Sequence, residues 1–295
     1  MRSMRVGFCA AVVAAAGIAV AACGGASPVS SPAKAATPAT PKSPIEAIDA
    51  AYTTTSTAGS AKISMDASFT GAQLQGQSIG ITASGVVDFA HKAGDLTMNL
   101  MGMDMEMRYI DNIEYMHAPS QLLGKDGGKP WIKIDMNEAV KEKLGASLDQ
   151  LTNGQPSDPT QILSYLRGMG TVTDKGPATV DGTPTERYQA ELNVADLAKK
   201  ENLTAGQEAM MEKALGDKQV PMQLWIDQQN RLRQMSYSQS MDLGAISGAK
   251  TGPDAGAIAM QMTMKLSDFG TPVTVTVPPA DQTQDALAEL HAGGK

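Results

Sequence analysis

The sequence predicts an α+β fold, in which one large, curved antiparallel β-sheet carries a few helices packed on one face. Three observations favour this class. Apolar and polar residues alternate over many short segments, helical spacing occurs in three or four others, and their order lacks the strand–helix–strand rhythm of a parallel sheet. We expect about eleven or twelve strands in all.

The N-terminal residues have the features of an export signal. Arg2 and Arg5 precede an apolar run over 6–20, which is too short to span a bilayer as a helix. The segment "VAAC" (20–23) resembles the lipobox of bacterial lipoproteins, in which the cysteine is acylated and becomes the first residue. We therefore expect a signal peptide over 1–22 and an anchor at Cys23 that holds the protein on the outer face of the cell membrane. An ordinary secreted protein with a chance cysteine is the alternative.

Residues 23–44 are expected to form a flexible tether behind this anchor. They consist mainly of Gly, Ala, Ser, Thr and Pro, which cannot bury a core. Fully stretched, at roughly 3.3 Å per residue, the tether would reach about 70 Å. The chain has only two cysteines, Cys9 and Cys23, so the mature protein has no disulfide and its fold depends on its core.

Composition and motifs argue against several functions. The formal net charge of −7 makes nucleic-acid binding unfavourable. The three histidines, His91, His117 and His291, are dispersed, and the sequence contains no hydrolase, P-loop or zinc-protease motif. Asp104 and Glu106 share the polar face of a strand, which predicts solvation rather than acid–base chemistry. We expect no enzyme, no cofactor and no metal.

The first half of the body predicts one helix followed by a meander of strands. Pro44 begins a helix over about 44–57, with Ile45 and Ile48 on its apolar side and Gly59 after its end. Period-two alternation then predicts the strands. They lie over 61–69, 78–89, 96–100, 103–109, 112–117 and 130–135.

The second half alternates helices and strands. Helices are expected over 136–145, from Pro159 to about residue 170 with Asp158 as N-cap, and over 194–215. Strands are expected over 171–179, 184–193, 220–227, 231–241, 258–269 and 272–277. Asp227 is expected to open the turn before the strand that begins at 231. The loop at 244–257 has no core signature.

Methionine is unusually abundant, with 19 residues against 4 phenylalanines. Met103, Met105 and Met107 repeat with period two, as do Met260, Met262 and Met264, which places each set on one face of a strand. Neighbours on one strand face lie about 7 Å apart, too far to converge on Cu(I) without help from a turn. Because Met adapts to irregular apolar shapes, these faces suit either a cavity for acyl chains or ordinary core filling.

Several segments resemble actinobacterial lipoproteins of the LppX/LprA/LprF/LprG type. They are "GKPWIKID" (128–135), "PATVDGTPTERYQAELNVADL" (177–197), "VPMQLWIDQQNRLRQMSYS" (220–238) and "MKLSDFGTPVTVTVPPA" (264–280). Asn230 stands where the family commonly has Gly, and Asn tolerates a positive φ. The resemblance implies the LolA/LolB/LppX-like fold: a half-barrel of about eleven strands, with helices covering the concave face.

The same resemblance implies a lipid-binding domain over 45–280, followed by a C-terminal tail over 281–295. Its hydrophobic cavity would hold acyl-chain lipid or lipidated glycan, for transport or presentation at the cell envelope. The cavity-lining residues expected from this sequence are Ile63, Met65, Met98, Met105, Met107, Leu163, Leu166, Leu224, Met260, Met262 and Met264. A surface-anchored interaction or sensor module with a filled core is the main alternative, and a Met-based copper protein is a third.

Overall fold

The computed structural model describes residues 43–71, 77–117, 128–138, 159–169, 171–193, 195–196, 199, 204–206, 209, 219–242 and 257–287. All of them belong to one of the two units into which the chain divides, Thr37–Lys295. None of the helices in this described part is long and apolar enough to cross a membrane.

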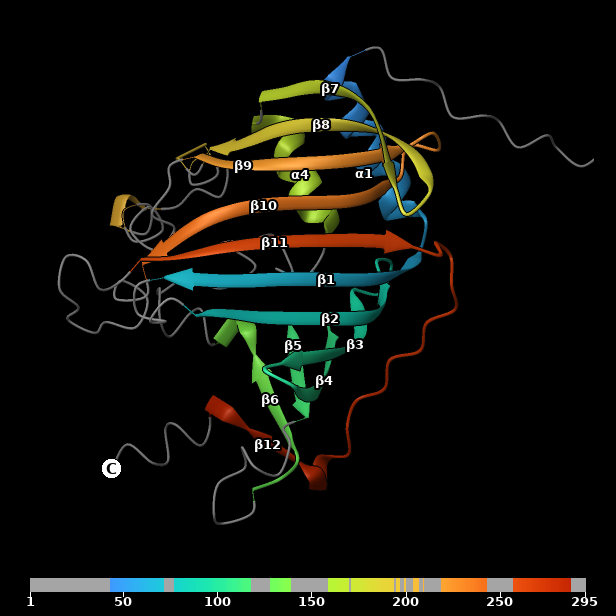
Figure 1. Ribbon diagram of the computed structural model, residues 1–295. Coiled ribbons are helices and arrows are strands. Elements are labelled where there is room, and N and C mark those ends of the chain that lie inside the picture. The colour runs from blue at the N-terminus through green and yellow to red at the C-terminus, as the bar shows by residue number, and fades with distance from the viewer. Residues whose placement is uncertain are drawn as a thin grey trace, which may run out of the picture. The chain divides into compact units, whose positions relative to one another are not determined.

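Twelve strands form one sheet with the order β12-β6-β5-β4-β3-β2-β1-β11-β10-β9-β8-β7 (Figure 1). Their bounds are β1 Ser60–Gly71, β2 Ser78–Asp88, β3 Ala93–Leu100, β4 Met103–Ile110, β5 Ile113–His117, β6 Trp131–Asp135, β7 Thr171–Val180, β8 Thr183–Asn193, β9 Gln219–Asp227, β10 Leu232–Asp242, β11 Ala257–Ser267 and β12 Thr283–Asp285. Every pairing is antiparallel except that of β12 with β6. The predicted fold class is therefore confirmed, and the two meanders β1–β6 and β7–β11 join where β11 pairs with β1.

Tight turns with positive φ connect many of these strands. Met101 and Gly102 have φ of 53° and 84° between β3 and β4, as a two-residue hairpin with the native twist requires. Asp181 and Gly182 make the same kind of turn between β7 and β8. Asn230, in the β9–β10 turn, has φ of 58°, so the expectation of a positive φ at this residue is confirmed.

The sheet bends between β2 and β3, and glycine permits it. In Figure 1 the strands from β7 to β2 run across the view, whereas β4, β5 and β6 turn steeply away. Gly85 of β2 lies opposite Leu96 of β3, and a Cβ atom at this position would overlap the carbonyl oxygen of Asp95. The two backbones therefore approach closely at the bend because residue 85 has no side chain.

Two helices, α1 (Pro44–Thr57) and α4 (Pro159–Met169), pack against each other on one face of the sheet. Pro44 begins α1 as predicted, and the Ser43 hydroxyl accepts a hydrogen bond from the Glu46 amide at 3.4 Å. Ile45 was predicted on the apolar side but is 36% exposed, because the buried side of α1 consists of Ala47, Ile48, Ala51 and Thr55. We call the sheet face under these helices the inner face and the opposite one the outer face.

The C-terminal part differs from the sequence prediction. Residues 272–277 form no strand, although Val and Thr alternate there. In Figure 1 this segment passes the ends of the strands instead of running along one, and both long edges of β11 are already paired with β1 and β10. It leads to β12, a three-residue strand too short for alternation to predict. The expected Asp158 cap and most of the helices over 136–145 and 194–215 lie outside the described residues.

Candidate functional site

The inner face of the sheet carries a continuous row of apolar side chains across eight strands. The pairing registers align Met105, Met98, Ala83, Met65, Met264, Met235, Leu224 and Tyr188 from β4 to β8. Successive strands therefore place a thioether beside another thioether, as in the direct pairs Met98–Met105 and Met65–Met264. The periodic methionines of the sequence thus converge on one surface.

One half of this surface is closed by helices. Helix α1 contacts β7 and β10, and α4 contacts β8, so both lie over the β7–β10 half of the sheet (Figure 1). Leu163 and Leu166 of α4 are fully buried against Leu224 and its neighbours in one hydrophobic core. This half is an ordinary packed interior.

The other half of the inner face is only partly covered. Along β1, burial falls from Ile63, which is 4% exposed, to Met65, Ala67 and Phe69, which are all half-buried. The same gradient runs along β4 from Met107. It also runs along β11 from Met264 to Met262 and Met260. We call the half-buried apolar set the methionine face; it consists of Met65, Ala67, Phe69, Met98, Leu100, Met103, Met105, Met260 and Met262.

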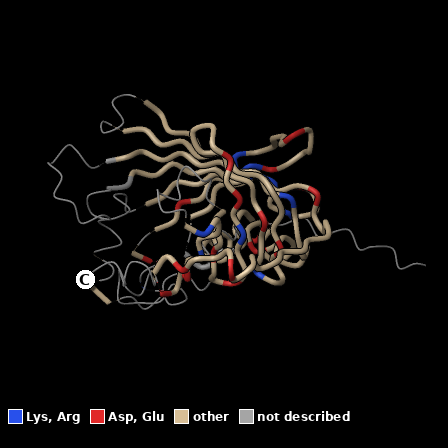
Figure 2. The backbone as a smooth tube through the Cα atoms, turned by 90° about the horizontal axis from the view of Figure 1, so that it is seen from below, with Lys and Arg blue, Asp and Glu red and all other residues tan. Residues whose placement is uncertain are grey.

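Charge is sparse around this half of the sheet. Residues 78–87 of β2 and 257–264 of β11 contain no Asp, Glu, Lys or Arg, and Asp66 of β1 and Asp104 and Glu106 of β4 lie on the outer face. Figure 2 shows the corresponding strand ends largely without acidic or basic colour. An apolar ligand placed on the methionine face would therefore desolvate few charged groups.

The residues expected to line a cavity all lie on strands β1, β3, β4, β9 and β11 or on α4, and they fall into three groups. Six belong to the packed core: Ile63, Met107, Leu163, Leu166, Leu224 and Met264. Met65, Met98 and Met262 are partly buried and pack against that core. Met105 and Met260 are half-buried at its margin. Only the last five belong to the methionine face.

Sequence reasoning missed two aromatic residues on the inner face, Phe69 and Tyr237. Phe69 pairs with Met260 across β1 and β11. Tyr237 lies opposite Met262, and its hydroxyl donates a hydrogen bond to the Met262 sulfur at 3.0 Å. Burial raises the pKa of the Tyr237 phenol, so the hydroxyl stays protonated and remains a donor. The period-two pattern would have indicated both residues once the strand pairing was known.

Glu114 of β5 is an unusual carboxylate on the same face. It lies opposite Tyr109, a core residue, and its other cross-strand neighbour is Ile134. Within the described part of the chain no hydrogen bond or ion pair reaches its side chain. Burial raises the pKa of Glu114 because the charged form loses hydration without gaining a partner.

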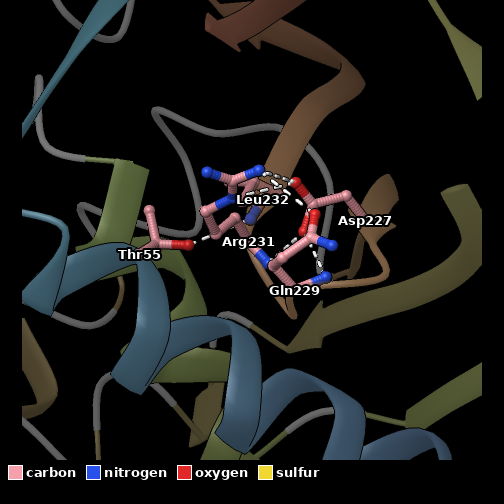
Figure 3. A network of polar contacts seen from close by, with 5 residues as sticks. All are labelled: Thr55, Asp227, Gln229, Arg231 and Leu232. Atoms are coloured by element: carbon pink, nitrogen blue, oxygen red, sulfur yellow. Dashed lines mark hydrogen bonds and ion pairs between the residues drawn. The ribbon is translucent and has the colours of Figure 1, made fainter. Parts of the chain in front are cut away.

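The β9–β10 turn fixes helix α1 in place above the sheet (Figure 3). Buried Asp227 opens the turn as predicted: its Oδ1 accepts the amides of Gln229 at 2.9 Å and Arg231 at 2.8 Å. Its Oδ2 accepts the Arg231 Nε at 2.9 Å. The next amide, of Leu232, donates to the Thr55 hydroxyl of α1 at 2.9 Å, and this bond is buried.

The polar residues considered for catalysis or metal binding lie apart from this face. Asp104 accepts a hydrogen bond from Asn99 at 2.7 Å, and Glu106 lies 3.5 Å from the Arg108 guanidinium; both are exposed on the outer face. His91 bonds Asp88 at 2.9 Å, and His117 packs edge-on against Trp131. Among the described residues no group of three or more His, Cys, Asp or Glu is placed to hold a metal.

Comparisons with known proteins place lipoproteins among the similar structures. No family model matches the chain. An uncharacterised 31.2 kDa protein in the rplA–rplJ intergenic region of Streptomyces griseus is 29% identical over 195 residues, which cover 64% of this chain and 59% of that protein. The chain thus matches about three fifths of that relative's length.

Two of the similar solved structures come from mycobacteria. Lipoprotein LppX of Mycobacterium tuberculosis is 15% identical with a TM-score of 0.46, over 79% of this chain and 97% of that one. LprF of Mycobacterium bovis is 12% identical with a TM-score of 0.40, over 80% of this chain and 97% of that one.

Proposed function

We propose that this protein binds the acyl chains of a lipid or lipidated glycan on its methionine face and transports or presents them at the cell envelope. The observation that carries the proposal is the half-buried apolar surface of β1, β3, β4 and β11, which continues the packed core past the edge of the helices. Apolar surface of this kind, set next to a rigid core, is typical of ligand and membrane-interaction sites.

The chemistry of the face suits a flexible hydrocarbon. Thioether side chains are unbranched and polarizable, so they adapt to chains of different length and saturation. Transfer of a sixteen-carbon chain from water onto such a surface contributes on the order of 12 kcal/mol at roughly 0.8 kcal/mol per CH₂, before binding costs are subtracted. No charged anchor is needed for binding of this strength.

The proposal includes the N-terminal segments that the sequence indicates. Signal peptide 1–22 would be removed, Cys23 would carry the acyl anchor, and residues 24–44 would tether the lipid-binding domain 45–280 to the outer face of the cell membrane. Two or more acyl chains on the anchor are sufficient for stable attachment. The protein would act as a carrier without catalytic residues.

A pair of variants tests the site. The first variant combines Met98→Gln and Met105→Gln, which keep the length of both side chains but place two amides on the methionine face. We expect the affinity for a fluorescent sixteen-carbon fatty acid to fall at least about tenfold, because the lost apolar contact is worth more than about 1.4 kcal/mol. Met101→Gln, in the exposed β3–β4 turn, is the matched control and should bind as the parent does. Equal affinity in all three proteins would contradict the proposed site.

One observation favours the alternative of an interaction module with a filled core. Six of the expected cavity residues are buried within the packed hydrophobic core. In that case the protein would take up no fatty acid at any concentration below the micelle range. Saturable uptake by the parent protein would exclude this alternative.

A further inference from the structure

The outer face of the sheet carries a groove that the lipid proposal does not use. It has a volume of about 370 Å³ and lies over β8 to β11, on the side opposite the helices. The side chains that line it are Gln189, Pro221, Gln223, Ser236, Ser238, Gln261 and Thr263. Met222, Tyr237 and Met262 also border it, but they alternate toward the inner face and so contribute backbone to its floor.

The groove follows β10 because the lining side chains of that strand, Ser236 and Ser238, are short. Ser236 lies between Gln223 of β9 and Thr263 of β11, and Ser238 lies opposite Gln261. Gln189 extends the β9 wall onto β8, opposite Gln223. Two serines thus form the base of a trough whose walls are longer amide side chains.

The lining is uncharged and, apart from Pro221, polar. Residues 219–226 of β9, 234–241 of β10 and 257–264 of β11 contain no charged residue. The nearest lysine, Lys265, forms an ion pair with Asp181 at 2.8 Å. Charged residues border the groove without lining it: Asp66 of β1 lies opposite Thr263, and Arg187 and Glu191 flank Gln189 on the same face of β8. The lining itself offers an ionic ligand no counter-charge to replace its hydration.

The available hydrogen-bonding groups select the ligand chemistry. Each Gln amide offers two donors and an acceptor, and each Ser or Thr hydroxyl can both donate and accept. The backbone offers little more, because β9, β10 and β11 are interior strands paired on both sides. A peptide cannot add to them as an extra strand, since that mode needs a free edge.

We propose that this trough, which we call the serine groove and which consists of Gln189, Gln223, Ser236, Ser238, Gln261 and Thr263, binds a neutral carbohydrate. Sugar hydroxyls both donate and accept, as the lining does, and they carry no charge to desolvate. The volume of the groove is at the lower end of the range for small-ligand sites, which suits one or two sugar rings. The site is independent of the methionine face because the two lie on opposite sides of the sheet.

Protein-observed NMR with defined sugars tests the groove. The probes are maltose, cellobiose, lactose and mannobiose, with glucuronic acid and glucosamine as charged counterparts, added to the ¹⁵N-labelled full chain carrying Cys23→Ser. We expect at least one neutral disaccharide to bind with a Kd of about 1 mM or tighter. It should shift the amide signals of Ser236, Ser238 and Gln223 more than those of the inner face.

Matched tyrosine substitutions locate the site. Ser236→Tyr fills the trough and should weaken sugar binding at least about tenfold. Ser84→Tyr places the same side chain on the outer face of the sheet, in β2 and outside the groove. This variant should bind the sugar as the parent protein does. Gln223→Ala is a second groove variant, with the same expected loss, if Ser236→Tyr fails to fold. Fatty-acid uptake should be unchanged in all three variants, which separates this site from the proposed lipid site.

Several results would overturn the proposal. One is that no neutral disaccharide binds at about 10 mM. Another is that the charged sugars bind more tightly than the neutral ones. A third is that folded Ser236→Tyr or Gln223→Ala binds sugar as tightly as the parent protein. Equal shifts caused by a neutral Gln/Ser peptide would assign the groove to polypeptide instead and would equally reject a carbohydrate site.

Discussion

Burial of Glu114 in the folded protein disfavours ionisation of its carboxyl group. Its pKa is raised by burial, so the folded protein holds this proton at pH values where the unfolded chain has lost it. The free energy of unfolding must therefore fall as the pH rises from the ordinary range of a carboxyl group through the raised pKa. Above that window the destabilisation is complete and constant.

Glu114→Gln should remove this effect. We expect the variant to unfold at a higher urea concentration than the parent at pH 7, because no charge remains to be desolvated, and the difference should shrink as the pH is lowered toward 4. Urea titrations at several pH values measure it. Glu186→Gln, at an exposed position of β8, is the control and should follow the parent. A Glu114→Gln variant less stable than the parent at pH 7 would show that the carboxylate is stabilised in the fold.

At the scale of single residues, alternation predicts the face of a strand residue better than its depth. Met65 and Met264 were both assigned to the inner face, and the structure pairs them there. Yet Met264 is buried and Met65 is half-buried, because the described helices α1 and α4 lie over the β7–β10 half of the sheet. How deeply a strand residue is buried depends on the helices packed over it, and the sequence of the strand alone does not specify them.

Among the elements, helix α1 is held to the sheet by a buried hydrogen bond in addition to its buried apolar side. The Thr55 hydroxyl accepts the Leu232 amide, and both residues are almost fully buried. Thr55→Val keeps the shape of the side chain but leaves that amide without its acceptor. We expect a loss of about 1–3 kcal/mol in the free energy of unfolding, measured by urea denaturation.

Thr57→Val is the matched control on the same helix. The Thr57 side chain is exposed, and its hydroxyl donates to carbonyls of its own helix, those of Thr53 at 2.7 Å and Thr54 at 3.3 Å. Its replacement should therefore change stability by less than about 0.5 kcal/mol. Equal losses in the two variants would mean that the bond from α1 to β10 contributes nothing specific.

The long elements could be predicted, and the short or context-dependent ones could not. Helix α1 was predicted because Pro44, helical spacing and Gly59 agree at its two ends. Residues 272–277 alternate like a strand but have no free edge beside them. Strand β12 has three residues and a parallel partner, so neither its pattern nor its pairing was visible in the sequence.

At the scale of the whole molecule, the order of the strands in the sheet brings methionines from distant parts of the sequence together in one site. The methionines of β3 and β4 are far in sequence from those of β11, and they meet only because β11 pairs with β1. Sequence alone predicted an antiparallel sheet but not this junction, which is a long-range contact. The methionine face depends on it, whereas the serine groove lies within the meander of β8 to β11.

Native mass spectrometry of the full chain carrying Cys23→Ser, purified from a bacterial host without lipid extraction, tests the central proposal most directly. We predict a population heavier than the protein by the mass of a lipid, which disappears on organic extraction and is reduced in the Met98→Gln, Met105→Gln variant. A single ligand-free mass before and after incubation with palmitate would contradict acyl-chain binding on the methionine face.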